Sequence, residues 1–195
     1  MNALDIRPLA RDEVAFVYHE YLEADFSDDE RKPLSMILQS LDAGRYLCLG
    51  AFCGDQLLAY AFFIFDTAPA GRNYLLDYFA VREDLRAQGI GSRFLKALPG
   101  ILPDPALMIL EVENPDYAED PGEKALRLRR IGFYQKNGAV DTGVAFWFFD
   151  VEYRLMGISM NGAACTPDRV RTAYTTTLRT VIPPALLRKN LRFHE

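Results

Sequence analysis

Residues Tyr74 to Leu98 read YLLDYFAVREDLRAQGIGSRFLKAL, and the other elements of the chain can be arranged around them. The apolar run from Leu75 to Val81 predicts a buried strand, and the apolar spacing from Ile90 to Leu98 predicts a helix. Between them, the sequence RAQGIG places two glycines where the helix begins. Because the first N–H groups of a helix lack partners within it and lie at the positive end of its dipole, this loop predicts an anion site suited to phosphate.

Two familiar phosphate-binding loops do not fit this stretch. A dinucleotide-binding loop has its glycines directly after the strand and a third small residue, whereas here residues 82–88 precede Gly89 and Phe94 takes the third position. A P-loop requires Lys-Ser or Lys-Thr after its last glycine, and Ser92-Arg93 follows here. Both kinds of nucleotide site are therefore excluded.

The composition is that of an ordinary globular protein. Half of the 195 residues are apolar and a quarter are charged, which suits one well-buried domain. No apolar run approaches the length of a membrane span, and the N-terminus lacks a signal-peptide core. The three cysteines match no metal-binding spacing, so we expect no metal. Free thiols are typical of the reducing cytoplasm, so we expect a cytoplasmic protein. Because no apolar run could span a membrane, we also expect no membrane partner. The net charge of −5 argues against a nucleic-acid partner.

Charge is distributed unevenly along the chain. Residues 1–32 hold nine acidic and four basic residues, whereas residues 121–137 hold five basic residues and Glu123 as the one acid. This asymmetry favours two ligands of opposite charge, although solvated helix faces would give the same pattern.

The remaining patterns predict the element order β-αα-βββ-α-β-α-ββ, followed by a helical tail. Strands are expected at residues 4–9, 46–52, 56–65, 74–81, 108–113, 140–149 and 151–158. Helices are expected around residues 14–22, 33–41, 90–98 and 121–136, and in the tail from Thr166 until Pro183-Pro184 breaks it. Asp120 followed by Pro121 and Glu123 is a strong N-terminal capping pattern for the fourth of these helices.

The opening stretch resembles the acetyl-CoA motif of the GNAT superfamily of N-acetyltransferases. In that motif an apolar strand ending in Val and a short acidic turn lead into Arg/Gln-x-x-Gly-x-Gly/Ala at a helix start. Arg86-Ala87-Gln88-Gly89-Ile90-Gly91 matches every fixed position at the family's spacing. The element order matches the family over roughly residues 3–158, and no part of the tail is covered.

The resemblance implies an α+β fold with a mixed, mostly antiparallel central sheet of about six to seven strands flanked by helices. It assigns residues 1–160 to the acyltransferase domain. Residues 161–195 would form a C-terminal helical extension that packs on the domain or on a second subunit, and the second arrangement would make a homodimer.

The resemblance also implies a cofactor site. Backbone N–H groups from Arg86 to Ser92 would hold the pyrophosphate of acetyl-CoA, and Met108 to Glu113 would form one wall of the cleft for the pantetheine arm. The opposite wall would consist of Phe79, Ala80 and Val81. Where many members carry Asn and Ala in contact with the cofactor, this chain has Arg127 and Arg130. These arginines could reach the CoA phosphates or an acidic acceptor, or could be solvated.

Attack of an amine on a thioester needs a base for the amine proton and an acid for the departing thiolate. Tyr134 stands where members that use a tyrosine acid carry it, although a tyrosine there could also belong to the inward face of its helix. Glu111, Glu113 and Asp77 are the candidate bases. Each of these acids could instead be paired with an arginine at the strand edge.

These observations predict an acyl-CoA-dependent N-acetyltransferase that acts on a primary amine by direct attack in a ternary complex. The acceptor would be a small molecule or a peptide, and the acidic N-terminal region favours a cationic one. The alternative is a catalytically inactive acyl-CoA-binding regulatory module.

Overall fold

The computed structural model describes residues 4–28 and 30–194, and it has the α+β architecture that the sequence predicts. Its strands form one mixed sheet in the order β1-β2-β3-β4-β5-β7-β6-β8. The pair β4–β5 is parallel, whereas β1–β2, β2–β3, β5–β7, β6–β7 and β6–β8 are antiparallel. The strands are β1 Asp5–Pro8, β2 Tyr46–Cys53, β3 Gln56–Ala68, β4 Gly71–Val81, β5 Pro105–Glu113, β6 Val140–Phe148, β7 Val151–Ser159 and β8 Leu191–Phe193.

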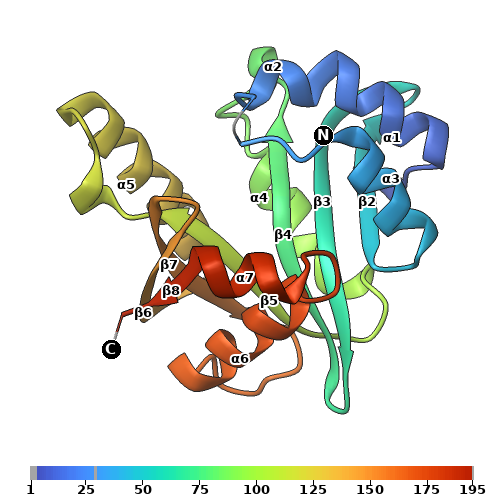
Figure 1. Ribbon diagram of the computed structural model, residues 1–195. Coiled ribbons are helices and arrows are strands. Elements are labelled where there is room, and N and C mark those ends of the chain that lie inside the picture. The colour runs from blue at the N-terminus through green and yellow to red at the C-terminus, as the bar shows by residue number, and fades with distance from the viewer. Residues whose placement is uncertain (1–3, 29, 195) are drawn as a thin grey trace. The chain divides into compact units, whose positions relative to one another are not determined.

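Helices and short helical turns connect the strands (Figure 1). The α-helices are α1 Arg11–Val17, α2 Glu23–Asp25, α3 Leu34–Asp42, α4 Ile90–Ala97, α5 Pro121–Lys136, α6 Pro167–Leu178 and α7 Pro184–Asn190. A π-helical turn, η1 Tyr18–Leu22, joins α1 to α2, and the 3-10 turns are η2 Glu83–Leu85, η3 Leu98–Gly100 and η4 Pro115–Tyr117.

The chain divides into two compact units, residues 1–64 with 77–102 and residues 65–76 with 103–195. In the first unit, α1 and α3 lie on one face of the strands and α4 lies on the other (Figure 1). The side chains between these layers are buried and almost entirely apolar, including Val14, Leu22, Ile37, Leu49, Phe62 and Phe94. The assignment of residues 1–160 to one acyltransferase domain stays a prediction.

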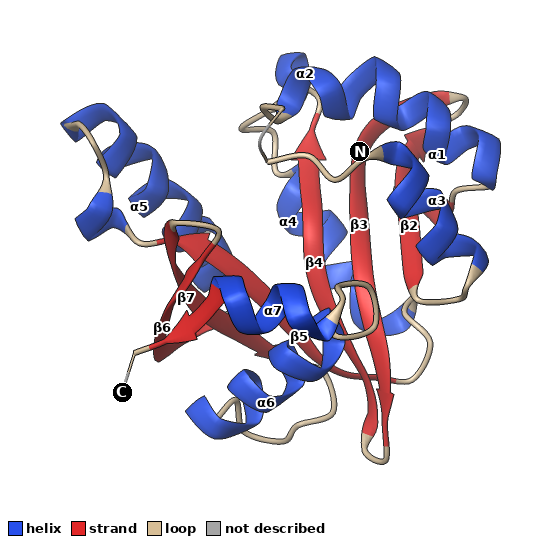
Figure 2. Cartoon of the chain, viewed as in Figure 1, coloured by secondary structure: helices blue, strands red, loops and turns tan. Residues whose placement is uncertain are grey.

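The second unit is built on the antiparallel strands β5, β7 and β6. The register places Glu111 of β5 opposite Leu155 of β7 and Glu113 opposite Tyr153. The hairpin between β6 and β7 turns at Phe149 and Asp150, which both have positive φ, at 46° and 65°. Helix α6 packs against β5, β6 and β7 (Figure 2).

Helix α5 begins and ends where the sequence predicts. The Asp120 side chain accepts a hydrogen bond from the Glu123 N–H at 2.9 Å, and Pro121 occupies the first helical position, where its missing N–H costs nothing. The helix ends before Asn137, and Gly138 follows with φ of 93°. Local side-chain chemistry therefore fixes both ends of α5.

Replacing Asp120 with Ala is expected to lower the free energy of unfolding by about 1 kcal/mol, because the first turn of α5 loses its side-chain acceptor. The Asp120→Asn variant is the matched control, since its amide oxygen can still accept this hydrogen bond. Urea denaturation followed by circular dichroism measures both. Equal stability of the Ala and Asn variants would show that the cap contributes nothing.

The tail differs from the prediction in where its helix ends. Helix α6 ends at Leu178, before the predicted break at Pro183-Pro184, and Pro184 begins a further helix, α7, because a helix tolerates proline at its first position. The strand β8, which the sequence did not predict, then pairs with β6 and brings the sheet to eight strands in the described residues. A three-residue strand is too short to show a period-2 pattern.

Candidate functional site

The loop between β4 and α4 has the backbone that its two glycines suggest. Ala87 and Gly89 both have positive φ, at 62° and 77°, and Gly89 is the N-cap of α4. A Cβ atom added at Gly89 would meet nothing within 4 Å, so open space lies beside the loop. The glycine is needed here for its conformation, and the space beside it can admit a ligand.

The N–H groups at the start of α4 are available to such a ligand. The first backbone hydrogen bond of the helix runs from Arg93 N to Gly89 O at 3.0 Å. Within the part of the chain that the structure describes, no protein acceptor takes the N–H groups of Gly89, Ile90 and Gly91. Unpaired donors at the positive end of a helix dipole favour an anion, and the phosphate site here stays a prediction.

The arginine that begins the motif is held by the protein itself. Arg86 donates from Nη2 to Asp25 Oδ1 at 2.9 Å and from Nε to the carbonyl oxygen of Val81 at 3.2 Å. The second Asp25 oxygen accepts a hydrogen bond from Tyr60 at 2.9 Å. Burial raises the pKa of Tyr60, and the Asp25 charge raises it further. Arg86 therefore fixes the shape of the loop, and it is supported by Asp25 and Tyr60, which the sequence did not suggest.

A hollow of about 670 Å³ lies beside Arg86 in the same unit. Two of its acids are neutralised, because Asp84 pairs with Arg82 at 2.5 Å and Asp25 pairs with Arg86. Glu20 and Glu83 have no ion-pair partner among the described residues. The hollow is lined by Glu20, Tyr21, Ala24, Asp25, Arg82, Glu83, Asp84 and Arg86.

The end of β4 carries the residues predicted to line the pantetheine arm. Phe79, Ala80 and Val81 are half-buried. The Phe79 ring meets the Phe94 ring of α4 edge to face at 5.6 Å, so this part of the strand is packed against the helix that follows the loop.

Asp77, the candidate base on β4, is enclosed in a polar network. Its side chain is 4% exposed, and it accepts hydrogen bonds from Lys32 Nζ at 2.6 Å and from the Tyr46 hydroxyl. Burial raises the pKa of Tyr46, as does the nearby Asp77 charge. Lys32 also donates its backbone N–H to the Tyr78 hydroxyl at 2.7 Å. The network fastens the segment before α3 to β4 and occupies both carboxylate oxygens.

The two carboxylates on β5 have different partners. Glu113 pairs with Arg127 and Arg130 of α5, each at 3.2 Å. Glu111 accepts a hydrogen bond from the hydroxyl of Tyr174, which belongs to α6 in the C-terminal extension. The sequence shows Tyr174 only as one member of an apolar helix face, so this contact was not foreseen.

The two α5 arginines also differ. Arg127 is 9% exposed and reaches Glu123 at 2.6 Å and the carbonyl oxygen of Asn114 at 2.8 Å, in addition to Glu113. It therefore belongs to the interior of its unit and is not a solvated side chain. Arg130 lies half-exposed on the helix surface.

Tyr134 lies on the inward side of α5. Its side chain is 9% exposed, and no described residue forms a hydrogen bond with its hydroxyl. Burial raises its pKa to about 12, although the positive charge of Arg130 acts in the opposite direction. The phenol therefore stays protonated at neutral pH and can act as a proton donor.

The predicted residues thus fall into two groups, one in each compact unit. The first unit brings together Asp77, Phe79, Ala80, Val81 and residues 86–92. The second brings together Glu111, Glu113, Arg127, Arg130 and Tyr134.

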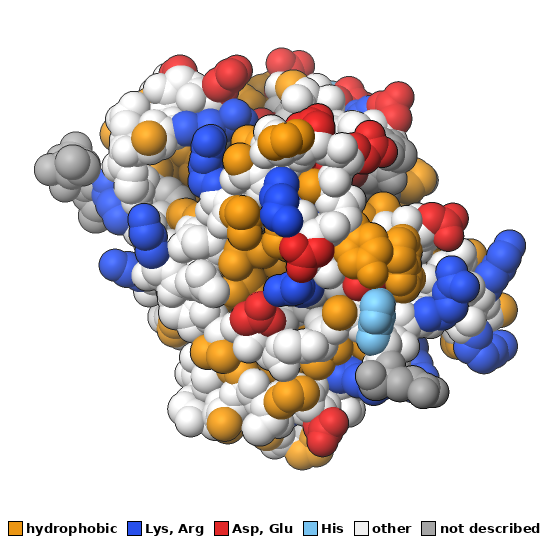
Figure 3. Space-filling model, turned by 90° about the vertical axis from the view of Figure 1, so that its left-hand side faces the viewer, with side chains coloured by type: hydrophobic (Ala, Val, Ile, Leu, Met, Phe, Trp, Pro, Cys, Tyr) orange, Lys and Arg blue, Asp and Glu red, His pale blue; other side chains and the backbone are white. Residues whose placement is uncertain are grey.

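Residues 4–28 and 30–194 contain neither a membrane-spanning helix nor a metal-binding cluster. No helix there has the length and apolar character required to span a membrane. No three His, Cys, Asp or Glu side chains there are grouped so that they could hold a metal ion. On the face seen in Figure 3, acidic, basic and apolar side chains are interspersed.

Comparisons with known proteins show the family to which this chain belongs. The sequence model described as the acetyltransferase (GNAT) family matches residues 14–139. No curated protein sequence matches the chain significantly.

Several solved structures share the fold. An acetyltransferase assigned to the GNAT family from Bacteroides thetaiotaomicron is 22% identical, with a TM-score of 0.66, over 91% of this chain and 98% of that one. An aminoglycoside 6'-N-acetyltransferase complexed with coenzyme A is 16% identical, with a TM-score of 0.55, over 82% and 99% of the two chains. NAA60 from Arabidopsis thaliana in complex with acetyl-CoA is 14% identical, with a TM-score of 0.58, over 82% and 99%. Since the family match spans well over half of the sequence, this chain belongs to the acetyltransferase (GNAT) family.

Proposed function

We propose that this protein transfers the acetyl group of acetyl-CoA to a primary amine, by direct attack of the amine within a ternary complex. Acetyl-CoA is the cofactor of the family. The observation that carries the proposal is the open loop at Gly89, where the N–H groups that begin α4 have no protein acceptor in the described chain.

The loop residues Arg86, Ala87, Gln88, Gly89, Ile90, Gly91 and Ser92 would hold the pyrophosphate through backbone N–H groups. The space beside Gly89 fits this role, because a phosphate oxygen needs close access to the backbone. Arg86 supports the loop through Asp25, so its main task is shape. The half-buried residues Phe79, Ala80 and Val81 would line the pantetheine arm. When bound, acetyl-CoA supplies an activated thioester carbonyl.

Among the three candidate bases, we propose Glu111. Asp77 is almost fully buried and bound by Lys32 and Tyr46, and Glu113 is shared by two arginines. In both of these acids, each carboxylate oxygen already accepts a hydrogen bond from a side chain of the protein. Glu111 accepts a hydrogen bond from the phenol of Tyr174, and it is half-buried near the end of its strand. Glu111 would take the proton that the amine loses as its nitrogen bonds to the carbonyl carbon.

Tyr134 is proposed as the acid that protonates the departing sulfur as the carbon–sulfur bond breaks. Its pKa of about 12 keeps the phenol protonated at neutral pH, so its proton is present when the thiolate leaves. A covalent intermediate on cysteine has little support, because burial raises the pKa of both Cys48 and Cys165. For Arg127, the three partners inside its unit favour a supporting role over contact with CoA.

We further propose a cationic acceptor. The hollow beside the motif carries two acids without ion-pair partners in the described chain, Glu20 and Glu83, together with the aromatic ring of Tyr21. This combination suits a protonated amine. An aminoglycoside 6'-N-acetyltransferase that shares this fold is consistent with such an acceptor.

The test is thiol release from acetyl-CoA in the presence of a panel of amines, with mass spectrometry of the products. We expect turnover with at least one cationic primary amine, gain of one acetyl group by that amine, and no reaction with its tertiary analogue. Preference for acidic amines would contradict the charge argument. Tight CoA binding with no turnover across the whole panel would instead favour an acyl-CoA-binding regulatory module.

A further inference from the structure

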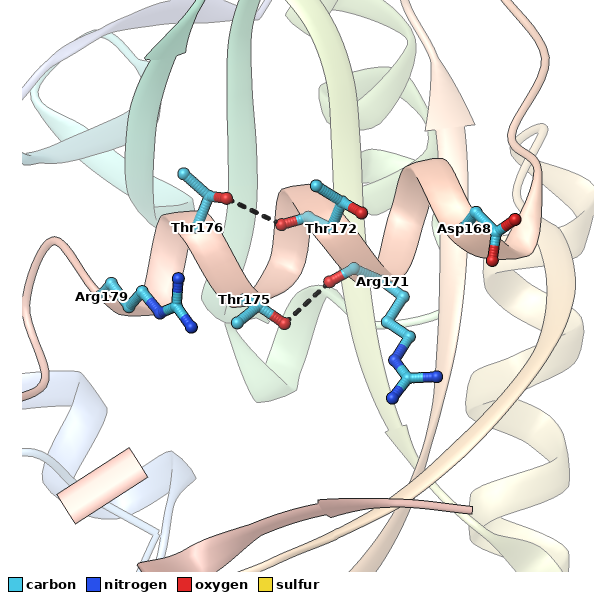
Figure 4. A pocket seen from close by; sticks show the side chains of 6 residues that line it. All are labelled: Asp168, Arg171, Thr172, Thr175, Thr176 and Arg179. Carbon is cyan, nitrogen blue, oxygen red and sulfur yellow. Dashed lines mark hydrogen bonds between the residues drawn. The ribbon is translucent and has the colours of Figure 1, made fainter. Parts of the chain in front are cut away.

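Helix α6 of the C-terminal extension turns one face inward and one outward. Val170, Tyr174 and Leu178 are at most 1% exposed, so they form the inward face. The outward face is polar, and two of its threonine hydroxyls, those of Thr175 and Thr176, bond to carbonyl oxygens of the helix itself (Figure 4). The residues drawn there are Asp168, Arg171, Thr172, Thr175, Thr176 and Arg179.

The position of α6 is fixed at several points. Arg169 in its first turn donates to the carbonyl oxygens of Ala163, Ala164 and Ala106, and Ala106 belongs to β5. Contacts farther along the helix involve Tyr174, whose ring lies 5.0 Å from that of Phe146 on β6. A side chain held between an anchored helix and a sheet has little freedom to move.

The Tyr174 hydroxyl lies in this interior and donates its hydrogen bond to Glu111 Oε1 on β5. Since Tyr174 is 0% exposed, water cannot replace this partner. A buried donor without an acceptor destabilises the folded protein, because its lost hydration is not replaced. Hydrogen bonds to charged acceptors are also stronger than those to neutral ones. The contact is therefore an ordered link between the extension and one particular carboxylate.

Packing alone does not explain a tyrosine at this position. Phe146 and Phe193 supply aromatic surface on the same side of α6 without a hydroxyl group. A phenylalanine at position 174 would keep those ring contacts and would not place a polar atom in the interior. The ring contacts therefore explain an aromatic residue at position 174, and the hydroxyl group needs a separate explanation.

We propose that Tyr174 is a positioning residue that orients the carboxylate of Glu111 for catalysis, an inference that rests on the proposed function. Holding Oε1 with a fixed donor sets the plane of the carboxylate and so directs the lone pairs that receive the amine proton. Proton transfer depends steeply on this orientation. The C-terminal extension, which lies beyond the match to the family, thereby contributes to the active site.

The Tyr174→Phe variant tests this role, because it removes the hydroxyl and keeps the ring. We expect kcat to fall about tenfold to a hundredfold, with the KM for acetyl-CoA and the calorimetric affinity for CoA unchanged. The matched control is Thr177→Val, which deletes another fully buried hydroxyl from the same helix. Its kcat should equal that of the wild type, and thermal unfolding of each variant checks that it folds.

A double-mutant cycle with Glu111→Gln separates positioning from a general structural effect. If Tyr174 acts through Glu111, the double variant should be no slower than Glu111→Gln alone. Additive losses, or an unchanged kcat in Tyr174→Phe, would overturn the inference while leaving the proposed function intact. A wild-type protein that acetylates no amine would instead refute the proposed function, and this role for Tyr174 would fall with it.

Discussion

A Gly89→Asp variant is expected to bind acetyl-CoA about tenfold to a hundredfold more weakly than the wild type. The substitution places a carboxylate at the N-cap of α4, in the open space where we propose that the pyrophosphate lies. The new charge repels the phosphates and can also accept hydrogen bonds from the N–H groups that should bind them. Isothermal titration calorimetry with CoA measures the loss directly.

The control for this variant is Gly44→Asp. Gly44 also has positive φ, at 65°, and a Cβ added there would also meet nothing within 4 Å. Both substitutions therefore place a non-glycine residue at a positive φ, with similar backbone strain, and both add the same charge. If Gly44→Asp weakened CoA binding as much as Gly89→Asp, the effect would come from folding or net charge, and the α4 site would be wrong.

The second large effect is expected from Tyr134→Phe. Removing the proposed acid should lower kcat by about 10² to 10⁴, because the thiolate would leave without a proton donor. CoA affinity should stay within about twofold of the wild type, since the change deletes one hydroxyl and keeps the ring. Steady-state kinetics and calorimetry together distinguish loss of chemistry from loss of binding.

The pKa of Tyr134 adds a check on its role. A phenol with a pKa of about 12 stays protonated through pH 10, so Tyr134 should impose no loss of activity below that pH. The control variant is Tyr117→Phe, because Tyr117 is 50% exposed and close in sequence to α5. An unchanged kcat in Tyr134→Phe would remove this residue as the acid.

Local chemistry explains what could be predicted from the sequence. Asp120 and Gly138 act on their own neighbours, so both ends of α5 are set by a few adjacent residues. The loop at Gly89 is likewise a local feature, because positive φ and a helix start need only the residues around them. The fold class, which the resemblance to the GNAT superfamily implied together with the order of such elements, is confirmed.

The side-chain partners could not be predicted, because they join residues far apart in the chain. Asp25 meets Arg86, Lys32 meets Asp77, and Tyr174 meets Glu111 only after the strands and helices have assembled. Each tyrosine or acid alone has an ordinary place in its local pattern. Periodicity and capping therefore cannot show that Asp77 and Glu113 bind cationic side chains.

Charge along the sequence was informative only in part. The excess of acids in residues 1–32 includes Glu13 and Asp25, which pair with Arg7 and Arg86. In the basic stretch, Arg127 likewise pairs with acids of its own unit. Much of the asymmetry is thus neutralised locally, and the argument for a cationic acceptor depends on the hollow beside the motif.

Binding of acyl-CoA at the N–H groups that begin α4 underlies every other step of the proposed reaction. Backbone amide NMR during a titration with CoA can detect it, because each amide reports its own contact. We expect the amides of Gly89, Ile90 and Gly91 to show the largest saturable shifts, at one common dissociation constant. Saturable binding that shifts amides elsewhere and leaves these three unchanged would contradict it.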